Sequence, residues 1–329
     1  MSAERNFYHI GYGKAGSSTL QCVFFPTHKE ISFYGIQYFE DVTPYWPFEE
    51  AGRLCGQLVH PEYFDGFLPG DVAHINRQKA LAAEHGKAFV YSNDHFSLLV
   101  APQWSVAKMK ELIPDAHIVV VLRRQQDIIK SIYKYRGKGL IYVPPRYHNG
   151  FVSFDEYFDL AHKNFLNRGG HKARDWVVDY FRIIDFNRLV NYYAEGFGEK
   201  NVHILFFEDL ARAPREFYRN LTSILGVSFD PHATYVVDNK AINSSATPAE
   251  IQYERWKYAL LGNFSFAKNL PMFGKISAAV RAKLRAKRGG GDIELNERQL
   301  EVFRSIYSEG NRQLAQRFGL DLASRGYLV

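Results

Sequence analysis

The stretch that most constrains the fold is residues 6–21, which read NFYHIGYGKAGSSTLQ. Residues 7–10 predict a short strand, a tight glycine-containing loop follows, and residues 19–25 predict a helix. Ser17 or Ser18 is expected to cap that helix. In such an arrangement of strand, loop and helix, the free backbone N–H groups and the positive end of the helix point to one place, where an anion can bind. We therefore predict that a phosphate-like ligand binds at the tip of the first strand.

The order of residues in this loop differs from that of a Walker A loop. Walker A reads GxxxxGK and then Ser or Thr. Here Lys14 precedes Gly16, and three hydroxyl residues follow: Ser17, Ser18 and Thr19. Residues 11–16 also fit the G-x-G-x-x-G pattern, but no acidic residue stands out after a second strand to bind a ribose. An ordinary strand-turn-helix connection with a solvated lysine is the alternative.

Composition limits the partners that the chain can have. Its 329 residues are 46% hydrophobic, which is enough for a sizeable core. The net charge of +6 suits an anionic ligand, but no dense basic arm is present, so we predict no nucleic-acid partner. Cys22 and Cys55 form no disulfide framework, and no cluster of His, Asp or Cys has the spacing of metal ligands, so we expect no metal.

The chain ends and the connecting segments give expectations about location and domain number. The first strand begins too early to leave room for a signal peptide, and no apolar run approaches the length of a membrane span. We therefore expect a cytoplasmic protein. We find no repeat, low-complexity segment or linker, so we expect one domain over residues 1–329. The sequence does not indicate the oligomeric state.

Three further apolar runs predict strands, at 88–92, 117–122 and 202–207. Helical patterns alternate with them at 75–85, 108–112, 128–135, 154–166, 183–197, 214–225 and 300–318. This alternation predicts an α/β fold: a P-loop-like domain with a central, mostly parallel sheet flanked by helices. Two segments, 22–75 and 137–150, are expected to be loop-rich insertions on the substrate side.

A second anion site is predicted where the strand 117–122 ends. Arg123 lies at its tip, and Ser131 follows eight positions later in the predicted helix. This separation fits an arginine at the helix entrance and a hydroxyl two turns further on, both facing one phosphate. For Arg123 alone, a surface salt bridge is the alternative.

These motifs resemble a known family. The order KAGSSTL in the first loop resembles the 5′-phosphosulfate loop of sulfotransferases that use 3′-phosphoadenosine 5′-phosphosulfate (PAPS). The step from Arg123 to Ser131 resembles the 3′-phosphate-binding segment of that family. Arg124 and Gln125 stand where the family often has Asn-Pro. The bacterial members, which act on carbohydrates and alcohols, are the ones that the chain resembles.

The resemblance implies in-line transfer of a sulfuryl group from PAPS to an acceptor hydroxyl, leaving 3′-phosphoadenosine 5′-phosphate (PAP). It implies that Arg123 and Ser131 bind the 3′-phosphate and that Lys14 neutralises charge on the bridging oxygen. The 5′-phosphate would be held by the first loop, Lys14, Ala15, Gly16, Ser17, Ser18 and Thr19. Aromatic residues between 34 and 67 favour a sugar, glycolipid or small alcohol as the acceptor.

The family's general base lies near the end of the second sheet strand, where this chain has Asp94 and His95. An imidazole, whose ordinary pKa is about 6.5, suits proton transfer near neutrality. Asp94 would need a raised pKa, or would orient the histidine. The residues do not separate the two, and we favour Asp94. A packed core histidine is the alternative for His95. We expect Glu208 to be structural, holding a backbone turn or an arginine.

Other interpretations remain open on the sequence alone. A nucleotide or small-molecule kinase would need a Walker order and an acidic Mg²⁺ ligand, and neither is evident. A non-catalytic binder of phosphoadenosine nucleotides is a third hypothesis. The basic stretch 275–288 can close a 3′-phosphate site, contact a membrane surface peripherally, or form a solvated helix.

Overall fold

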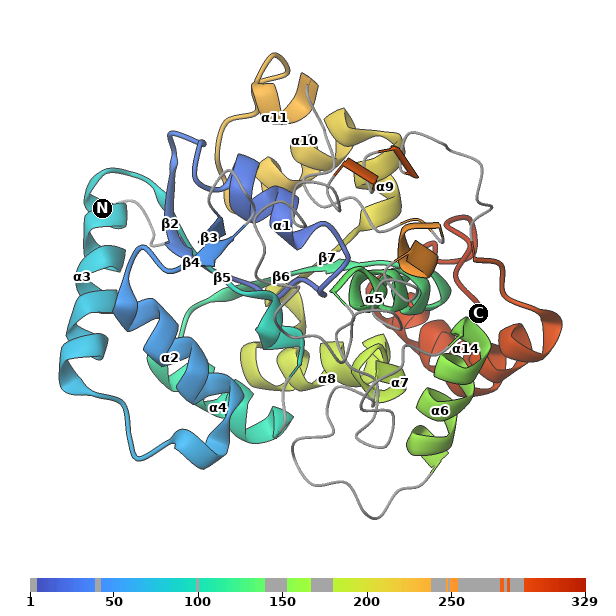
Figure 1. Cartoon of the computed structure of the whole chain (residues 1–329). Coiled ribbons are helices and arrows are strands. Elements are labelled where there is room, and N and C mark those ends of the chain that lie inside the picture. Colours follow the sequence, from blue (N-terminus) through green and yellow to red (C-terminus); the bar gives the residue numbers. More distant parts are fainter. Residues whose placement is uncertain are drawn as a thin grey trace, which may run out of the picture.

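A five-stranded sheet in the order β2-β5-β1-β6-β7 forms the centre of the computed structural model (Figure 1). Its strands are β1 (Asn6–His9), β2 (Ile31–Gly35), β5 (Ala88–Ser92), β6 (His117–Leu122) and β7 (Val202–Phe206). All neighbouring strands are parallel. The predicted α/β fold class, with its central parallel sheet, is therefore confirmed.

The structure describes residues 5–38, 43–98, 101–139, 153–166, 180–237, 247, 249–253, 279–280, 283–284 and 293–329. The predicted loop 137–150 lies outside them beyond residue 139, as does the basic stretch 275–288 apart from its residues 279–280 and 283–284. Within the described ranges, no helix is both long and apolar enough to cross a bilayer.

The strands are covered on both faces because they are apolar on both faces. All residues of β1 and β5 are buried, as are all but the first of β6. Helices α9 (Phe207–Arg212) and α10 (Pro214–Leu225) lie on one side of the sheet, together with the short α1 (Ser17–Thr19). On the other side lie α4 (Pro102–Leu112) and α8 (Phe186–Phe197) (Figure 1).

Two helices end at the residues that the sequence predicts, 225 and 318. Helix α10 begins at Pro214 and ends at Gly226, whose φ of 63° is left-handed. The C-terminal helix α14 (Glu297–Phe318) starts with a capping box and ends at Gly319, also with a φ of 63°. Helix α6 (Phe154–Leu166) has the predicted bounds. The predicted helix 183–197 is two helices, α7 (Tyr180–Ile183) and α8, with Asp185 capping the second.

The prediction that residues 22–75 form a loop-rich insertion is wrong, because most of this segment is regular structure. They contain β2, the hairpin strands β3 (Gln37–Tyr38) and β4 (Pro44–Tyr45), helix α2 (Glu49–Val59), and the start of α3 (Pro69–Glu84). Helix α2 buries an apolar stripe at helical spacing: Ala51, Leu54, Cys55 and Leu58. The flanking prolines and aromatic residues obscured this short stripe in the sequence.

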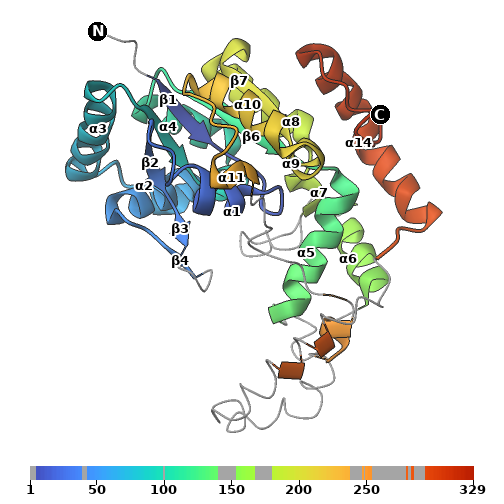
Figure 2. The same cartoon turned by 90° about the horizontal axis from the view of Figure 1, so that it is seen from above.

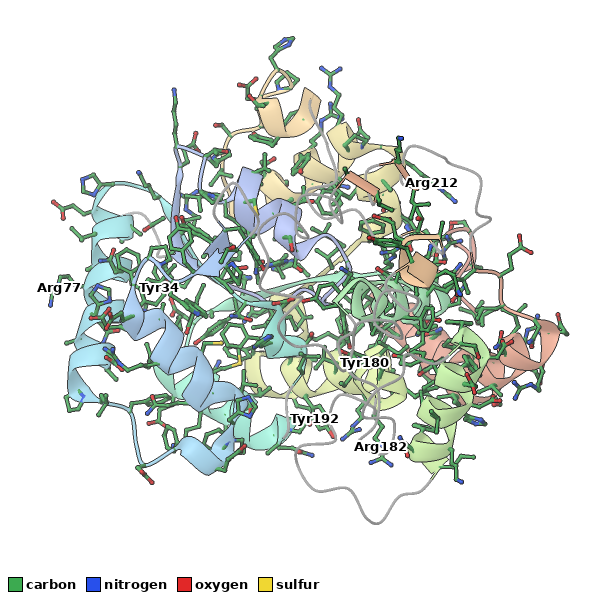
Figure 3. All side chains as sticks on the ribbon, in the orientation of Figure 1. Tyr34, Arg77, Tyr180, Arg182, Tyr192 and Arg212 are labelled. Atoms are coloured by element: carbon green, nitrogen blue, oxygen red, sulfur yellow. The ribbon has the colours of Figure 1, made fainter. Side chains whose placement is uncertain are left out.

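Aromatic residues of this region mostly pack the core. Tyr34, labelled in Figure 3, is only 1% exposed and stacks on Phe48 with ring centroids 5.3 Å apart. Its hydroxyl lies 3.1 Å from Nδ1 of His74 on α3. Tyr34 therefore joins the sheet edge to α2 and α3, as ordinary packing would predict, and is not a wall of an acceptor site.

The end of β6 is anchored from the C-terminal side of the chain. Helix α5 (Gln125–Gly139) follows this strand (Figure 2), and a hydrogen bond connects its first residue to α14. Gln125 donates from Nε2 to Oδ1 of Asn311 on α14 at 2.9 Å, and both side chains are buried. The Asn311 amide also donates to the carbonyl of Leu328 at 2.7 Å. This buried amide pair fixes the start of α5, and hence Arg123 just before it.

We predict that Asn311→Ala destabilises the fold, because the buried Gln125 side chain and the part-buried Leu328 carbonyl lose their hydrogen bonds to Asn311. The expected loss is about 1–3 kcal/mol of unfolding free energy, measured by urea denaturation. Gln313→Ala, on the exposed face of the same helix, is the matched control and should stay within about 0.5 kcal/mol of wild type. Equal effects of the two changes would contradict the assigned role.

Candidate functional site

The predicted site residues follow the ends of three adjacent strands. In the sheet β1 lies between β5 and β6, and the carboxyl ends of parallel strands meet at one edge. Lys14 follows β1, Asp94 follows β5 and Arg123 follows β6. Arg123 donates from Nη1 to the carbonyl of Lys14 at 2.7 Å. A Cβ built on Gly13 would lie 3.3 Å from Oδ2 of Asp94. The structure thus brings the three strand ends together.

The loop after β1 turns several N–H groups outward. Lys14 and Gly16 both have left-handed backbones, with φ of 73° and 87°. Such turns direct successive N–H groups to one side and form anion-binding concavities. The Ala15 N–H donates to Tyr12 O at 3.0 Å, whereas those of Gly13, Gly16 and Ser17 donate to no backbone carbonyl in the described part of the chain. The loop therefore offers open backbone donors beside the Lys14 charge.

Gly16 is required for packing as well as for conformation. A Cβ at this position would lie 2.9 Å from Cδ2 of Leu210 and 3.2 Å from the ring of Phe207. Both residues belong to α9, so this helix packs directly against the loop at Gly16. The contact places a wall of α9 beside the open N–H groups.

The predicted capping of the following helix is wrong. Gly16 is the N-cap of α1 and has no side-chain cap, while Ser17 and Ser18 already lie inside the helix. After Thr19 the helix continues as a π-helix over Leu20–Phe24. The buried Ser17 hydroxyl donates to Tyr12 O at 3.5 Å and so braces the loop from within. The left-handed Gly16 supplies the turn that a capping serine would have supplied.

Arg123 is held from two sides. Its guanidinium lies over the Phe207 ring, 4.4 Å from the centroid, and bonds the Lys14 carbonyl. Burial lowers the pKa of Arg123, with Asp127 and Glu208 acting in the opposite direction. An arginine keeps its charge even in such surroundings. The result is a fixed cation at the tip of β6.

The turn after Arg123 is made by Glu208, as predicted for a structural role. The Arg124 N–H donates to Oε1 of Glu208 at 3.0 Å, and Tyr327 donates to Oε2 at 3.1 Å. Glu208 is buried at the start of α9. This carboxylate therefore holds the turn at Arg124 that leads into α5.

Ser131 is buried on α5, one turn before Tyr135. The ring of Tyr135 lies 4.5 Å from Nζ of Lys14, which is a cation–π contact. Residues four apart share one face of a helix, so Ser131 lies on the face of α5 that approaches the Lys14 loop. Its part in binding phosphate stays a prediction.

Asp94 opens a 3-10 turn (Asp94–Ser97) directly after β5. The turn is capped by Asn93, whose Oδ1 accepts from the His95 N–H at 2.7 Å. Burial raises the pKa of Asp94, while the nearby His95 and Lys14 charges partly offset the rise. Asp94 keeps part of its surface accessible, and His95 is exposed, so His95 is not a packed core residue. A buried carboxyl with a raised pKa is a candidate general base, and this role of Asp94 stays a prediction.

Three residues at the site did not stand out in the sequence. Tyr135 contacts Lys14 and Phe207 contacts Arg123. Tyr38 on β3 interacts with Ser18, Asp94 and Tyr135. The position of Tyr135, one helical turn after Ser131, was a usable signal. Nothing local marks Tyr38 among its many aromatic neighbours. Within the described ranges, no group of three His, Cys, Asp or Glu side chains could hold a metal ion.

Comparisons with known proteins give only distant likenesses. No protein-family model matches the chain, and no curated protein matches it. Among solved structures, a sulfotransferase from Alicyclobacillus acidocaldarius is 20% identical with a TM-score of 0.47, over 78% of this chain and 92% of that one. The sulfotransferase domain of the curacin biosynthetic pathway is 13% identical with a TM-score of 0.36, over 79% of this chain and 98% of that one.

A mouse sulfotransferase complexed with PAP is 11% identical with a TM-score of 0.39, covering 87% of this chain and 90% of that one. With identities of 11–20% and TM-scores of 0.36–0.47, these likenesses do not determine what the chain binds or transfers.

We predict that Gly16→Ala destabilises the protein more than Gly86→Ala does. Both glycines are left-handed, but a Cβ at Gly86 meets nothing within 4 Å, whereas one at Gly16 meets α9. Gly86→Ala should cost about 1–2 kcal/mol from backbone strain alone. Gly16→Ala should cost roughly 1–3 kcal/mol more from overpacking. Urea denaturation of both variants measures the difference. Equal losses would show that α9 does not constrain the loop.

Proposed function

We propose that the chain is a sulfotransferase that moves a sulfuryl group from PAPS to an acceptor hydroxyl. The observation that carries this proposal is the contact of Arg123 with the Lys14 carbonyl, which joins two cationic strand ends into one site. PAPS needs two such ends, because it carries roughly two charges on its 3′-phosphate and about two more on its phosphosulfate.

The residues of the first loop fit the phosphosulfate end of the donor. Open N–H groups of Gly13, Gly16 and Ser17 lie beside the Lys14 charge. We propose that this loop, from Lys14 to Thr19, holds the 5′-phosphate. The Ser17 hydroxyl already donates to Tyr12, so its backbone N–H is the group that we assign to the ligand. No metal is required, since these donors and the lysine supply the positive charge.

The 3′-phosphate is assigned to the tip of β6 and the first turns of α5. Arg123 uses one guanidinium nitrogen for the Lys14 carbonyl and keeps other N–H donors for an anion. Ser131 would add a hydroxyl from α5. Arg123 bonds the Lys14 carbonyl, and Ser131 lies one helical turn before Tyr135, whose ring contacts Lys14, so we propose that one extended donor spans both anion sites.

The proposed reaction is an in-line displacement at sulfur. The acceptor oxygen forms a bond to sulfur while the bond from sulfur to the bridging oxygen breaks, and PAP leaves with that electron pair. Lys14 neutralises the charge that builds on the bridging oxygen. Asp94 takes the proton of the acceptor hydroxyl, because burial gives it a raised pKa and it lies beside Lys14. His95, exposed next to it, is the second candidate for this proton.

The acceptor is a small molecule or glycan with a hydroxyl group. Two tyrosines, Tyr38 and Tyr135, lie at the site, and aromatic faces pack well on sugar rings and aliphatic chains. This arrangement favours a sugar, glycolipid or small alcohol.

Calorimetric titration of PAP into the wild type, Lys14→Gln and Arg123→Gln tests the donor site. Removing one charge-assisted contact at Arg123 should weaken PAP binding by about 10- to 100-fold. Lys14→Gln should also lower turnover by about 10²–10³-fold, measured as PAP release from PAPS with a panel of sugars and alcohols. The charge-matched control is Lys108→Gln on α4, where the lysine pairs with Glu111 at 2.6 Å. This variant should leave the PAP affinity and the turnover unchanged.

ATP with Mg²⁺ is titrated in parallel. Binding of ATP–Mg²⁺ without binding of PAP would replace this proposal with a kinase. Tight PAP binding that persists with no turnover in any variant would favour a non-catalytic binder.

A further inference from the structure

A buried histidine lies beneath the loop that follows β1. His9 is the last residue of this strand and is 0% exposed, and its ring lies 5.2 Å from that of Phe25, measured between centroids. A Cβ built on Gly11 would lie 2.8 Å from Nε2 of His9 and 3.5 Å from Cβ of Ser17. The imidazole therefore fills the space under the loop, and a side chain at position 11 would collide with it.

The two nitrogens of this imidazole have different surroundings. Nδ1 lies 2.8 Å from Oγ of Ser92, the residue that pairs with His9 on the neighbouring strand β5. Nε2 has no hydrogen-bond partner in the part of the chain that the structure describes. Burial lowers the pKa of His9 to about 3, so the ring is neutral at working pH and carries a single N–H proton. The position of that proton decides whether Nε2 is a donor or an acceptor.

The hydrogen bonds around Ser92 place the proton. Nε2 of Gln21, from the π-helix that follows α1, donates to Oγ of Ser92 at 3.0 Å, and Gln21 is also 0% exposed. A hydroxyl has one proton to give, and among the described contacts of this Oγ the remaining acceptor is Nδ1 of His9. Nδ1 is then an acceptor, and the imidazole proton resides on Nε2. His9 thus presents an N–H donor to the underside of the loop.

The inner side of the loop is the side where its carbonyls need donors. In a trans peptide the N–H and C=O groups point in opposite directions, so a loop that turns N–H groups outward turns carbonyls inward. The Tyr12 carbonyl, in the same peptide as the open Gly13 N–H, accepts from the Ala15 N–H at 3.0 Å and the Ser17 hydroxyl at 3.5 Å. A lone pair on Nε2 of His9 would repel such inward carbonyls, whereas an N–H group attracts them.

Resting on the proposed function, we propose that His9 is a positioning residue for the loop after β1 and that it acts through its Nε2–H. An anion on the outer face draws the open N–H groups toward itself, and the carbonyls of the same peptides become more negative. The Nε2–H dipole stabilises them from beneath. Ser92 and Gln21 act one step further away, because they keep the proton on Nε2. The imidazole itself does not touch the ligand.

The first test reads the position of the proton directly. In protein labelled with ¹⁵N-histidine, the shifts of the two ring nitrogens show which one is protonated, and His9→Gln identifies the His9 signals by their loss. We expect the Nε2–H form in the wild type, with an Nε2 signal that shifts and saturates as PAP binds. Gln21→Met removes the donor that orients the Ser92 hydroxyl, so the Nδ1–H form should become populated in that variant.

The second test separates the two nitrogens by substitution. The amide nitrogen of asparagine can replace Nδ1, and that of glutamine can replace Nε2. His9→Asn therefore keeps the contact with Ser92, whereas His9→Gln keeps a donor under the loop. In calorimetry, PAP affinity should fall about 3- to 10-fold in His9→Asn, which loses one hydrogen-bond donor, and less than about 2-fold in His9→Gln.

The control for these substitutions is His28→Gln. His28 is also a buried imidazole, and its Nε2 lies 3.1 Å from the Ser228 carbonyl, away from the loop after β1. Its replacement should leave the PAP affinity at the wild-type value.

A wild-type His9 with its proton on Nδ1 would overturn the inference. So would a His9→Asn variant that binds PAP as tightly as His9→Gln, because the contact with Ser92 would then be the whole role of the ring. If neither variant folds, the wild-type tautomer and its response to PAP still decide. A wild type that shows the Nε2–H form but does not bind PAP would overturn the proposed function and not the assignment of the donor.

Discussion

The contact between the Arg123 guanidinium and the Lys14 carbonyl is the interaction on which the site depends. The 2.7 Å hydrogen bond from Nη1 of Arg123 to this carbonyl joins the tips of β1 and β6. It also holds Lys14, whose left-handed backbone leaves the N–H groups of the loop open. The N–H groups of Gly16 and Ser17 can face an anion only while that turn is kept. We therefore propose that this single arginine supplies charge at one anion site and fixes the backbone of the other.

Much of the fold serves to hold this contact in place. Glu208 fixes the turn after Arg123, and the Gln125–Asn311 pair fixes the start of α5. Helix α9 adds the Phe207 ring under Arg123 and fills the space that a side chain at position 16 would need. These supports come from α9 and α14, far along the chain from the loop. Stability and site geometry are thus set by the same long-range contacts.

The sequence predicted features that local chemistry determines, and it missed those that depend on distant contacts. Neighbouring residues determine each of these features. A run of β-branched residues makes the strand 117–122, and the order of lysine, glycine and hydroxyl residues marks the KAGSSTL loop. Glycines in left-handed turns end α10 and α14. The structural role of Glu208 was also predicted, and its bond to the Arg124 N–H confirms it. The capping role given to Ser17 or Ser18 is wrong, because Gly16 is the N-cap residue and α9 packs closely against it. Tyr38 could not be singled out from the sequence, since only the fold brings its hydroxyl to Oε1 of Gln21.

The most direct test of the donor site is a titration of the backbone amide signals of ¹⁵N-labelled protein with PAP. Binding at the proposed site predicts that the amide signals of Gly13, Gly16 and Ser17 shift together and saturate with one affinity, and that Arg123→Gln weakens that affinity. If PAP shifts amides elsewhere and leaves these three unchanged, or if only ATP–Mg²⁺ moves them, the loop is not a phosphosulfate site.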